Sequence, residues 1–427
     1  MIKKVYDAID EIIYSKKLDN GLTVLLLPKE EMSKTYSLFS TNYGSIDQSF
    51  VPYNSTEKIT VPEGIAHFLE HKLFEKEDHD VFADFGKQGA SANAYTSFTN
   101  TAYLFSATSQ IEQNLLTLLD FVQDPYFSDQ SVEKEKGIIE QEIKMYDDQP
   151  GWQSFMGTMR AMYVHHPANI DIAGTADSIK TITKEDLYTC YHTFYHPQNM
   201  TLFVAGNFNP EEIMHLIEEN QSKKEFPKAK EIERFFPEEP SQVATEELVV
   251  PLPVSIPKCT VGIKELTREL SKEEFLFREL MLEIVLDHYF SKGGSFYQTL
   301  YDEQLIDSSF GCSATLERGF GYTMISGDTS RPDDFANKVK ELLLQTKTDV
   351  LTAEELEILK KKKIGQLLSG MNSLEFIANQ YTHYYQFDID LFEMIPSIQE
   401  ITLEAANNFL QNWIDEERLT VCKVMEK

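Results

Sequence analysis

The pentamer His67-Phe68-Leu69-Glu70-His71 has the pattern H-x-x-E-H, and the rest of the chain is organised around it. In an α-helix, residues four apart are separated by about 40° around the axis, so both histidines would lie on one side. Glu70 would lie on the same side, about 60° from His67 in the other direction. Neutral imidazoles on neighbouring turns can bind a divalent metal, and a carboxylate beside them can accept a proton from water. The pattern predicts a metal-dependent hydrolytic site, and the alternative is a solvated helix face that happens to carry two histidines.

The residues around the pentamer predict how this helix is held. Pro62-Glu63-Gly64 is a helix-start signal directly before it. One face of the helix would be apolar and would anchor it in a core, through Ile65, Ala66, Phe68, Leu69 and Leu73. The two histidines and Glu70 would then occupy the opposite, polar face.

A second helix, expected at about 129–146, carries two carboxylates on its apolar side. Its apolar stripe consists of Val132, Ile139, Ile143 and Tyr146. Glu135 and Glu142 lie within this stripe, about 20° apart, whereas Glu133 and Glu140 point toward lysines and water. Burying a carboxylate without a cation or donor costs several kcal/mol, so either buried salt bridges or a metal should meet them. Catalytic zinc takes three protein ligands, and His-His-Glu is a known set, so this helix could complete the first.

Two strands, joined near Asn100, are expected after the motif helix. The first runs through Ala92, Asn93, Ala94, Tyr95 and Thr96, and it has small side chains on one face. Such a strand could form an exposed sheet edge that accepts another strand, with an ordinary hairpin as the alternative. Near the N-terminus we expect an amphipathic helix over residues 1–16, then a strand, turn and strand over 17–27.

Composition limits the class of protein. The chain has 427 residues, which makes two domains the first expectation. Its formal net charge of −30 argues against nucleic acid as a partner, because phosphates would be repelled. The four cysteines have no paired spacing, and we see neither a signal peptide nor an apolar run of membrane-spanning length. We therefore expect a cytoplasmic protein without membrane insertion.

The second half of the chain repeats the first. Ile182-Thr183-Lys184-Glu185 returns as Ile401-Thr402-Leu403-Glu404, an offset of 401 − 182 = 219. A weaker echo pairs 128–142 with 352–366, and there Gln366 takes the place of Glu142. The second half has no H-x-x-E-H. We expect a catalytic lobe at 1–220, a linker rich in Lys, Glu and Pro at 221–247, and a metal-free lobe at 248–427.

These patterns resemble the M16 zinc metallopeptidases (the pitrilysin and insulinase type, or inverzincins), and in particular their short two-lobed bacterial branch. The likeness covers nearly the whole chain. It rests on Asp19-Asn20-Gly21-Leu22, Gly64 to His71, Asn93-Ala94-Tyr95-Thr96, and Glu133-Lys134-Glu135 with Glu142.

The resemblance implies an α+β fold of two similar lobes, each a mostly antiparallel sheet with helices packed on one face. This is the processing-peptidase-like metallohydrolase fold. It implies one zinc ion per chain, held by His67, His71 and Glu142. Glu70 matches the general base, and Glu135 matches a second acidic residue near the site. The strand from Ala92 to Thr96 matches the edge that binds the substrate peptide.

One departure from the family concerns the second half. Members that work alone or as homodimers usually carry an Arg and a Tyr in a stretch like L-R-E-x-x-G-L-x-Y, which helps to hold the substrate carbonyl. The matching stretch here, Leu300 to Asp307, has neither residue in place, and Arg331 is a weak substitute.

We therefore expect a zinc metalloendopeptidase that cleaves extended or short peptides and works as a dimer with a second, related chain that supplies these groups. A homodimer stays open. The alternatives are a non-catalytic assembly or scaffold subunit of an M16-type complex, and a metal-binding module without hydrolysis.

Overall fold

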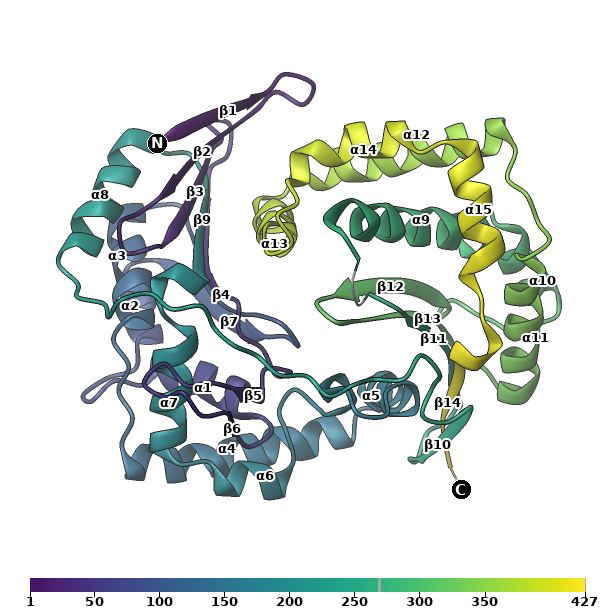
Figure 1. Ribbon diagram of the computed structural model, residues 1–427, viewed down its shortest axis with the longest axis horizontal. Coiled ribbons are helices and arrows are strands. Elements are labelled where there is room, and N and C mark those ends of the chain that lie inside the picture. Colours follow the sequence, from purple (N-terminus) through teal and green to yellow (C-terminus); the bar gives the residue numbers. More distant parts are fainter. Residues whose placement is uncertain (268–269, 427) are drawn as a thin grey trace. The chain divides into compact units, whose positions relative to one another are not determined.

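A computed structural model describes residues 1–267 and 270–426, which form two compact units. The first unit contains Met1–Ile143, Asp171–Phe236 and Leu368–Phe392. The second contains Lys144–Ile170, Pro237–Leu367 and Glu393–Lys427. Each unit combines one main β-sheet with helices, so the predicted α+β class is confirmed (Figure 1).

The first unit is built on a seven-stranded sheet in the order β1-β2-β3-β9-β4-β8-β7. Neighbouring strands are antiparallel except for β3 and β9, which are parallel. The strands are β1 (Ile2–Tyr6), β2 (Glu11–Lys17), β3 (Thr23–Pro28), β4 (Thr35–Thr41), β7 (Ala90–Thr96), β8 (Thr101–Ala107) and β9 (Met200–Gly206). A separate pair consists of β5 (Ser49–Phe50) and β6 (Ile59–Thr60).

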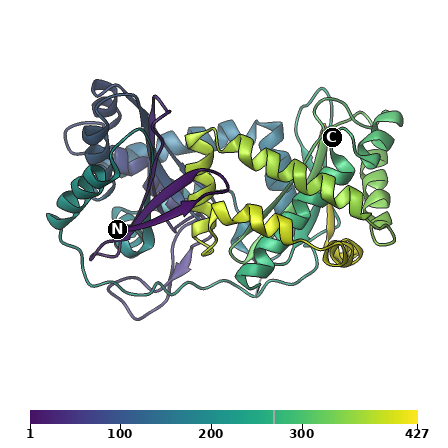
Figure 2. The same ribbon diagram turned by 90° about the horizontal axis from the view of Figure 1, so that it is seen from above.

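The N-terminal segment is a β-hairpin, so the helix predicted for residues 1–16 is wrong. Strands β1 and β2 pair in antiparallel register and form the purple hairpin in Figure 2. The spacing of Val5, Ile9, Ile12 and Ile13 fits a helical period as well as a strand. A short turn favours the hairpin over the helix, because Asp10 adopts a φ of 53° and the chain reverses direction there.

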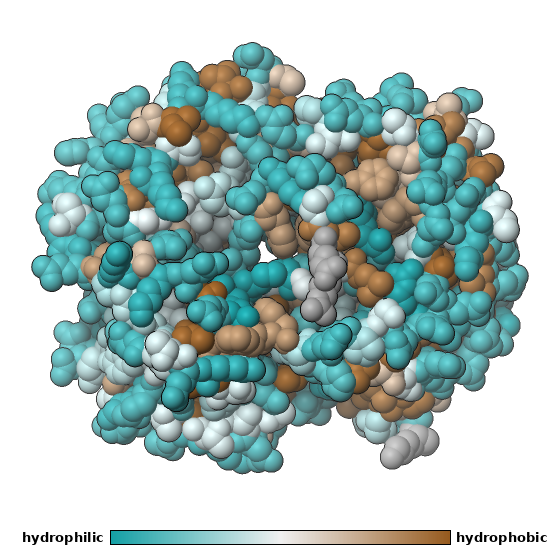
Figure 3. Space-filling view, viewed as in Figure 1, coloured by the Kyte–Doolittle hydropathy of each residue, from teal (hydrophilic) through white to brown (hydrophobic). Residues whose placement is uncertain are grey.

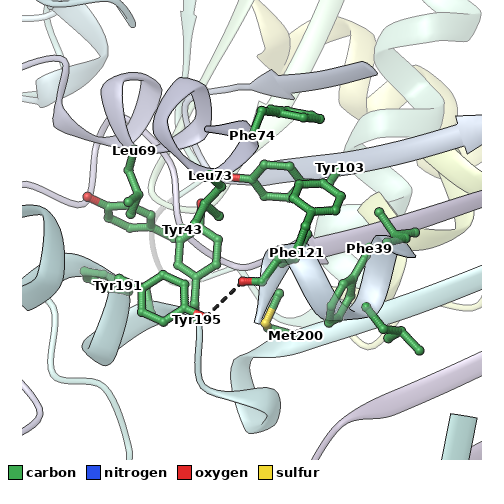
Figure 4. Packing of buried hydrophobic residues seen from close by; sticks show 14 of the residues in the cluster. Phe39, Tyr43, Leu69, Leu73, Phe74, Tyr103, Phe121, Tyr191, Tyr195 and Met200 are labelled. Carbon is green, nitrogen blue, oxygen red and sulfur yellow. Dashed lines mark hydrogen bonds between the residues drawn. The ribbon is translucent and has the colours of Figure 1, made fainter. Parts of the chain in front are cut away.

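One face of this sheet carries the main core of the first unit. The helices that pack there are α1 (Ile65–Phe74), α2 (Phe82–Lys87), α3 (Ile111–Val122), α4 (Asp129–Asp147), α7 (Lys184–Phe194) and α8 (Pro210–Ser222). The short α6 (Ala176–Thr181) precedes α7. Aromatic rings fill the space under α1, with Tyr103 and Tyr195 joined by a hydrogen bond of 2.8 Å between their hydroxyls (Figure 4).

The opposite face of the same sheet is covered by α13 (Leu374–Tyr385), a helix from the second half of the chain. Residues Phe39 and Val204 point into the main core, whereas the alternate residues Leu38 and Phe203 are also fully buried. The ring of Phe203 contacts that of Tyr381 on α13 at 5.4 Å between centroids. Figure 1 shows the sheet between α13 and the pair α3 and α8.

The second unit repeats the same sheet in shorter form. Its five strands run in the order β10-β14-β11-β13-β12. They are β10 (Glu247–Pro251), β11 (Lys258–Glu265), β12 (Gly311–Glu317), β13 (Phe320–Asp328) and β14 (Leu419–Met425). Its helices are α5 (Pro150–Met162), α9 (Lys272–Phe290), α10 (Ser295–Asp302), α11 (Pro332–Gln345), α12 (Ala353–Gly370), α14 (Met394–Glu400) and α15 (Leu403–Trp413).

The two sheets have equivalent topology. The order β3-β9-β4-β8-β7 corresponds to β10-β14-β11-β13-β12, and the parallel pair lies at the same place in both sheets. Thr183 and Thr402 are equivalent, since each is the N-cap of its helix. The repeat read from the sequence is therefore an internal duplication of one fold.

The two halves exchange one helix each. Helix α5 packs on β11 and β14 of the second unit, where Gly157 lies against the Cys422 side chain. Helix α13 packs on β4 and β9 of the first unit. These helices occupy equivalent positions, because 374 − 150 = 224 is also the offset of the weaker sequence echo. Because of this exchange, each compact unit consists of separate stretches of the chain. Residues 224–233, within the segment expected to be a linker (221–247), lack regular structure.

In the described part of the chain, no helix is long and apolar enough to cross a membrane. The face shown in Figure 3 is largely hydrophilic, with apolar residues in separate small groups.

The docking of α13 can be tested at Ile377, which is fully buried in this helix. Ile377→Ala should destabilise the first unit by about 2–5 kcal/mol, because it removes buried methyl groups and leaves a cavity. Hydrogen exchange should accelerate in β4 and β9 but not in β11 and β14. Ile358→Ala on α12, where the side chain is 58% exposed, is the control and should change little. Faster exchange in β11 and β14 alone would contradict the assignment of α13 to the first unit.

Candidate metal centre and active site

The first turn of α1 is held by a close contact between two glycines. Gly64 is the N-cap and has a φ of 83°, which favours glycine. A Cβ atom on Gly64 would lie 2.3 Å from the carbonyl oxygen of Ala173, and Gly174 packs against it in turn. The loop before α6 thus presses on the start of the motif helix and fixes where it begins.

Helices α1 and α4 are anchored in the same hydrophobic core. The apolar face of α1 contributes Phe68, Leu69 and Leu73, and the stripe of α4 contributes Val132, Ile139 and Ile143. Figure 4 shows Leu69 and Leu73 pointing from α1 toward the aromatic cluster. Because both apolar faces are buried in one cluster, the polar side chains beside them meet at its border.

Three potential metal ligands converge at this border. One ligand atom from each of His67, His71 and Glu142 lies within 4.8 Å of the other two. The Nε2 atoms of His67 and His71 lie 3.7 Å and 3.5 Å from the two carboxylate oxygens of Glu142. Within residues 1–267 and 270–426, this is the only group of three His, Cys, Asp or Glu side chains arranged in this way.

Glu135 contacts the imidazole of His71 at Nδ1, the ring nitrogen that does not face Glu142. Its Oε1 lies 3.0 Å from Nδ1 of His71, and its side chain is only 9% exposed. A proton on Nδ1 that is donated to Glu135 leaves Nε2 of His71 free on the side of Glu142. Glu133, on the same helix, is exposed and pairs with Lys136. As predicted, Glu135 lies on the buried side of this helix and Glu133 points toward a lysine and water.

The charge balance of the cluster suits a divalent cation. Burial, together with the nearby His71, lowers the pKa of His67 to about 3, so its imidazole is neutral, as a metal ligand must be. Burial alone would lower the pKa of His71. The hydrogen bond to Glu135 and the charge of Glu70 outweigh it and raise this pKa above its usual value. The carboxylates around His71 thus favour a positive charge at this place, and the imidazole of His67 is neutral. Together these groups form a donor set that fits a divalent cation.

Glu70 lies beside these ligands and makes a different contact. Its residue is 8% exposed, and its Oε2 accepts a hydrogen bond of 3.1 Å from Oγ1 of Thr96. Burial raises the pKa of Glu70 to about 7, although His71 and the hydrogen bond from Thr96 oppose the rise. A carboxyl group with this pKa can both accept and return a proton near neutral pH.

Strand β7 forms one edge of the first sheet, as Figure 1 and the strand order show. Ala92 and Ala94 pack toward the core, and Thr96 reaches α1 through Glu70. The hydroxyl of Tyr95 donates a hydrogen bond of 2.9 Å to Oδ1 of Asn379 on α13. Sequence reasoning missed Asn379, since no local pattern links it to a strand 284 positions earlier.

Two further histidines and Arg331 make contacts of their own. His196 is buried and donates a hydrogen bond from its Nε2 to the carbonyl of Pro227, and His192 stacks on Tyr188. Arg331, in the second unit, pairs with Asp334. The stretch Leu300 to Asp307 covers the end of α10 and the turn that follows.

Comparisons with known proteins show the family of this chain. The family model described as "Insulinase (Peptidase family M16)" matches residues 57–176, and the model "Peptidase M16 inactive domain" matches residues 181–363. A Bacillus subtilis protein, described as the uncharacterized zinc protease YmfH, is 50% identical over 100% of both chains. A second uncharacterized zinc protease of B. subtilis, YmxG, is 26% identical over 83% of this chain and 86% of its own.

A solved structure supports the same assignment. The chain superimposes on an M16-like peptidase from Alicyclobacillus acidocaldarius with a TM-score of 0.93 and 40% identity, covering 98% of this chain and 99% of the other. The family inferred from the motifs is confirmed. Given this agreement in sequence and fold over its whole length, the chain belongs to the M16 peptidase family.

Proposed function

We propose that the protein is a zinc-dependent metalloendopeptidase. The observation that carries this proposal is the convergence of His67, His71 and Glu142 beside the buried carboxyl group of Glu70. Two imidazoles and a carboxylate are a ligand set of catalytic zinc, which keeps a further position open. We assign one zinc ion per chain to these three residues.

Each residue of the site would have a distinct task. When bound, zinc would supply Lewis-acid chemistry that acidifies water and polarises the scissile carbonyl. Glu70 accepts the proton of the attacking water and returns it to the leaving amine, for which its raised pKa is suited. Glu135 holds the ring of His71 through Nδ1 and keeps Nε2 available to the metal.

The proposed substrate is an extended or short peptide that pairs with the free edge of β7. An edge strand offers unpaired backbone N–H and C=O groups, which bind any extended peptide irrespective of its sequence. The small residues Ala92 and Ala94 leave room beside this edge, and the C-terminal end of the strand lies next to Glu70. We propose a cytoplasmic location, which the four free cysteines support.

The metal assignment predicts the zinc content of histidine variants. His67→Ala should lose bound zinc, measured by elemental mass spectrometry after dialysis, because one of three ligands is removed. His192→Ala is the matched control, since His192 and His196 have the same spacing but lie outside the site. Retention of a full equivalent of zinc by His67→Ala would refute the assigned ligand set.

The role of Glu70 is tested with the isosteric variant Glu70→Gln on a quenched fluorescent peptide. Because the amide cannot accept the proton, kcat should fall roughly 10²–10⁴-fold while zinc stays bound. Undiminished cleavage would exclude Glu70 as the base. If the wild-type chain binds zinc but cleaves no peptide under any condition, the non-catalytic scaffold subunit becomes the better assignment.

We further propose that the active form contains a second, related chain. The support is the absence of an Arg–Tyr pair at Leu300 to Asp307, where the resembling family usually carries it. Such a partner would supply groups that hold the substrate carbonyl. In a homodimer, residues of the second copy outside Leu300 to Asp307 would have to take this role.

This dependence predicts that the purified chain is weakly active at nanomolar concentration. Cleavage should rise with added partner or, for a homodimer, with the square of the chain's own concentration. Light scattering on the same samples gives the oligomeric state. Full activity of a monomer would contradict the two-chain proposal and leave the metal site unaffected.

A further inference from the structure

The hydrogen bond between Thr96 and Glu70 joins two parts of the proposed site. Thr96 is the last residue of β7, and its Oγ1 lies 3.1 Å from Oε2 of Glu70. Over residues 1–267 and 270–426, Thr96 is the sole hydrogen-bond partner of the Glu70 side chain. A nearly buried carboxyl group therefore depends on one hydroxyl for its orientation.

The direction of this hydrogen bond follows from its neighbours. An ionised carboxylate can only accept, so the Thr96 hydroxyl must donate. Thr101 lies opposite Thr96 in β8, with 3.4 Å between the two hydroxyl oxygens. The hydroxyl of Thr101 donates to the carbonyl of Tyr43 at 2.9 Å, in a fully buried position. Since the proton of Thr101 is engaged there, the proton of Thr96 is left for Glu70.

The contact also distinguishes the two oxygens of Glu70. Thr96 engages Oε2 and so restrains rotation of the carboxyl group, which leaves Oε1 as the oxygen without a protein hydrogen-bond partner in the described chain. Hydrogen bonds to charged groups are among the stronger ones in proteins, and losing a partner in a buried position is costly. Removing the hydroxyl should therefore change where Oε1 points.

We propose that Thr96 is a positioning residue that holds Glu70 through Oε2 and presents Oε1 to the attacking water. When Oε1 takes the proton, the water loses it and the carboxyl group becomes neutral, and Oε2 continues to accept from Thr96. This inference rests on the proposed peptidase function. It adds that Thr96, the last residue of the peptide-binding strand, also orients Glu70. One strand would then position both the substrate and the general base.

The competing explanation is that Thr96 serves only as part of the peptide-binding edge. In that case its loss would weaken substrate binding and raise KM, whereas a positioning role requires a lower kcat at unchanged KM. The structure favours positioning because the Thr96 side chain is engaged by Glu70, and only its backbone remains for a peptide.

The test uses the full chain, with its partner if one is needed, and a quenched peptide. Thr96→Val keeps the β-branched shape and removes the donor, so kcat should fall roughly ten- to a hundredfold with KM and zinc content unchanged. Thr96→Ser restores the hydroxyl and should stay within about threefold of the wild type. Thr23→Val on β3, which three strands separate from β7 in the sheet, is the control for the substitution itself. If Thr96→Val does not fold, Thr96→Ala takes its place with the same readouts.

Several outcomes would overturn the inference. They are a wild-type kcat in Thr96→Val, a raised KM at unchanged kcat, a loss of zinc, or a serine variant as slow as the valine variant. Glu70→Gln separates this failure from failure of the function. If Glu70→Gln is inactive while Thr96→Val is fully active, only the positioning role is lost. If Glu70→Gln is active, the proposed mechanism itself falls.

Discussion

The burial of the apolar faces of α1 and α4 in one core is the constraint on which the site depends. Neither helix alone carries all three of the proposed metal ligands. Once Leu69 and Leu73 from one helix and Ile139 and Ile143 from the other share a cluster, the polar residues beside them are forced together. Two imidazoles and the carboxylates of Glu70, Glu135 and Glu142 then occupy a partly buried space. Without a cation this arrangement would be costly, which is the physical argument for a metal.

The duplicated architecture explains how such a site is supported from both faces of the sheet. The core face of the first sheet carries α1 and α4, and the opposite face is covered by α13 from the other half of the chain. The edge strand β7 is paired to β8 along its length and reaches α13 through the hydrogen bond from Tyr95 to Asn379. A strand held in this way keeps its free edge extended, which is what pairing with a peptide requires.

What could be predicted from the sequence was the part encoded by local periodicity. The spacing of His67, Glu70 and His71, and of Glu135 and Glu142 within an apolar stripe, is visible within two helical segments. These side chains do lie together in the structure. The N-terminal hairpin was not predictable, because its apolar residues fit two periods and a four-residue turn decides between them. The position of α13 and the hydrogen bond between Asn379 and Tyr95 depend on packing between segments hundreds of positions apart. Local sequence patterns do not indicate such contacts.

The internal repeat shows why only one half can hold this chemistry. Helix α12 is the equivalent of α4, and Gln366 stands there where α4 has Glu142. An amide is a poor ligand for zinc and needs no cation when it is exposed to water, as Gln366 is. The second half has the sheet and the exchanged helix, which packs on the first sheet, but it has no carboxylate at the position equivalent to Glu142. Helix α13 covers β4 and β9, so the second half of the chain contributes directly to the fold of the first unit.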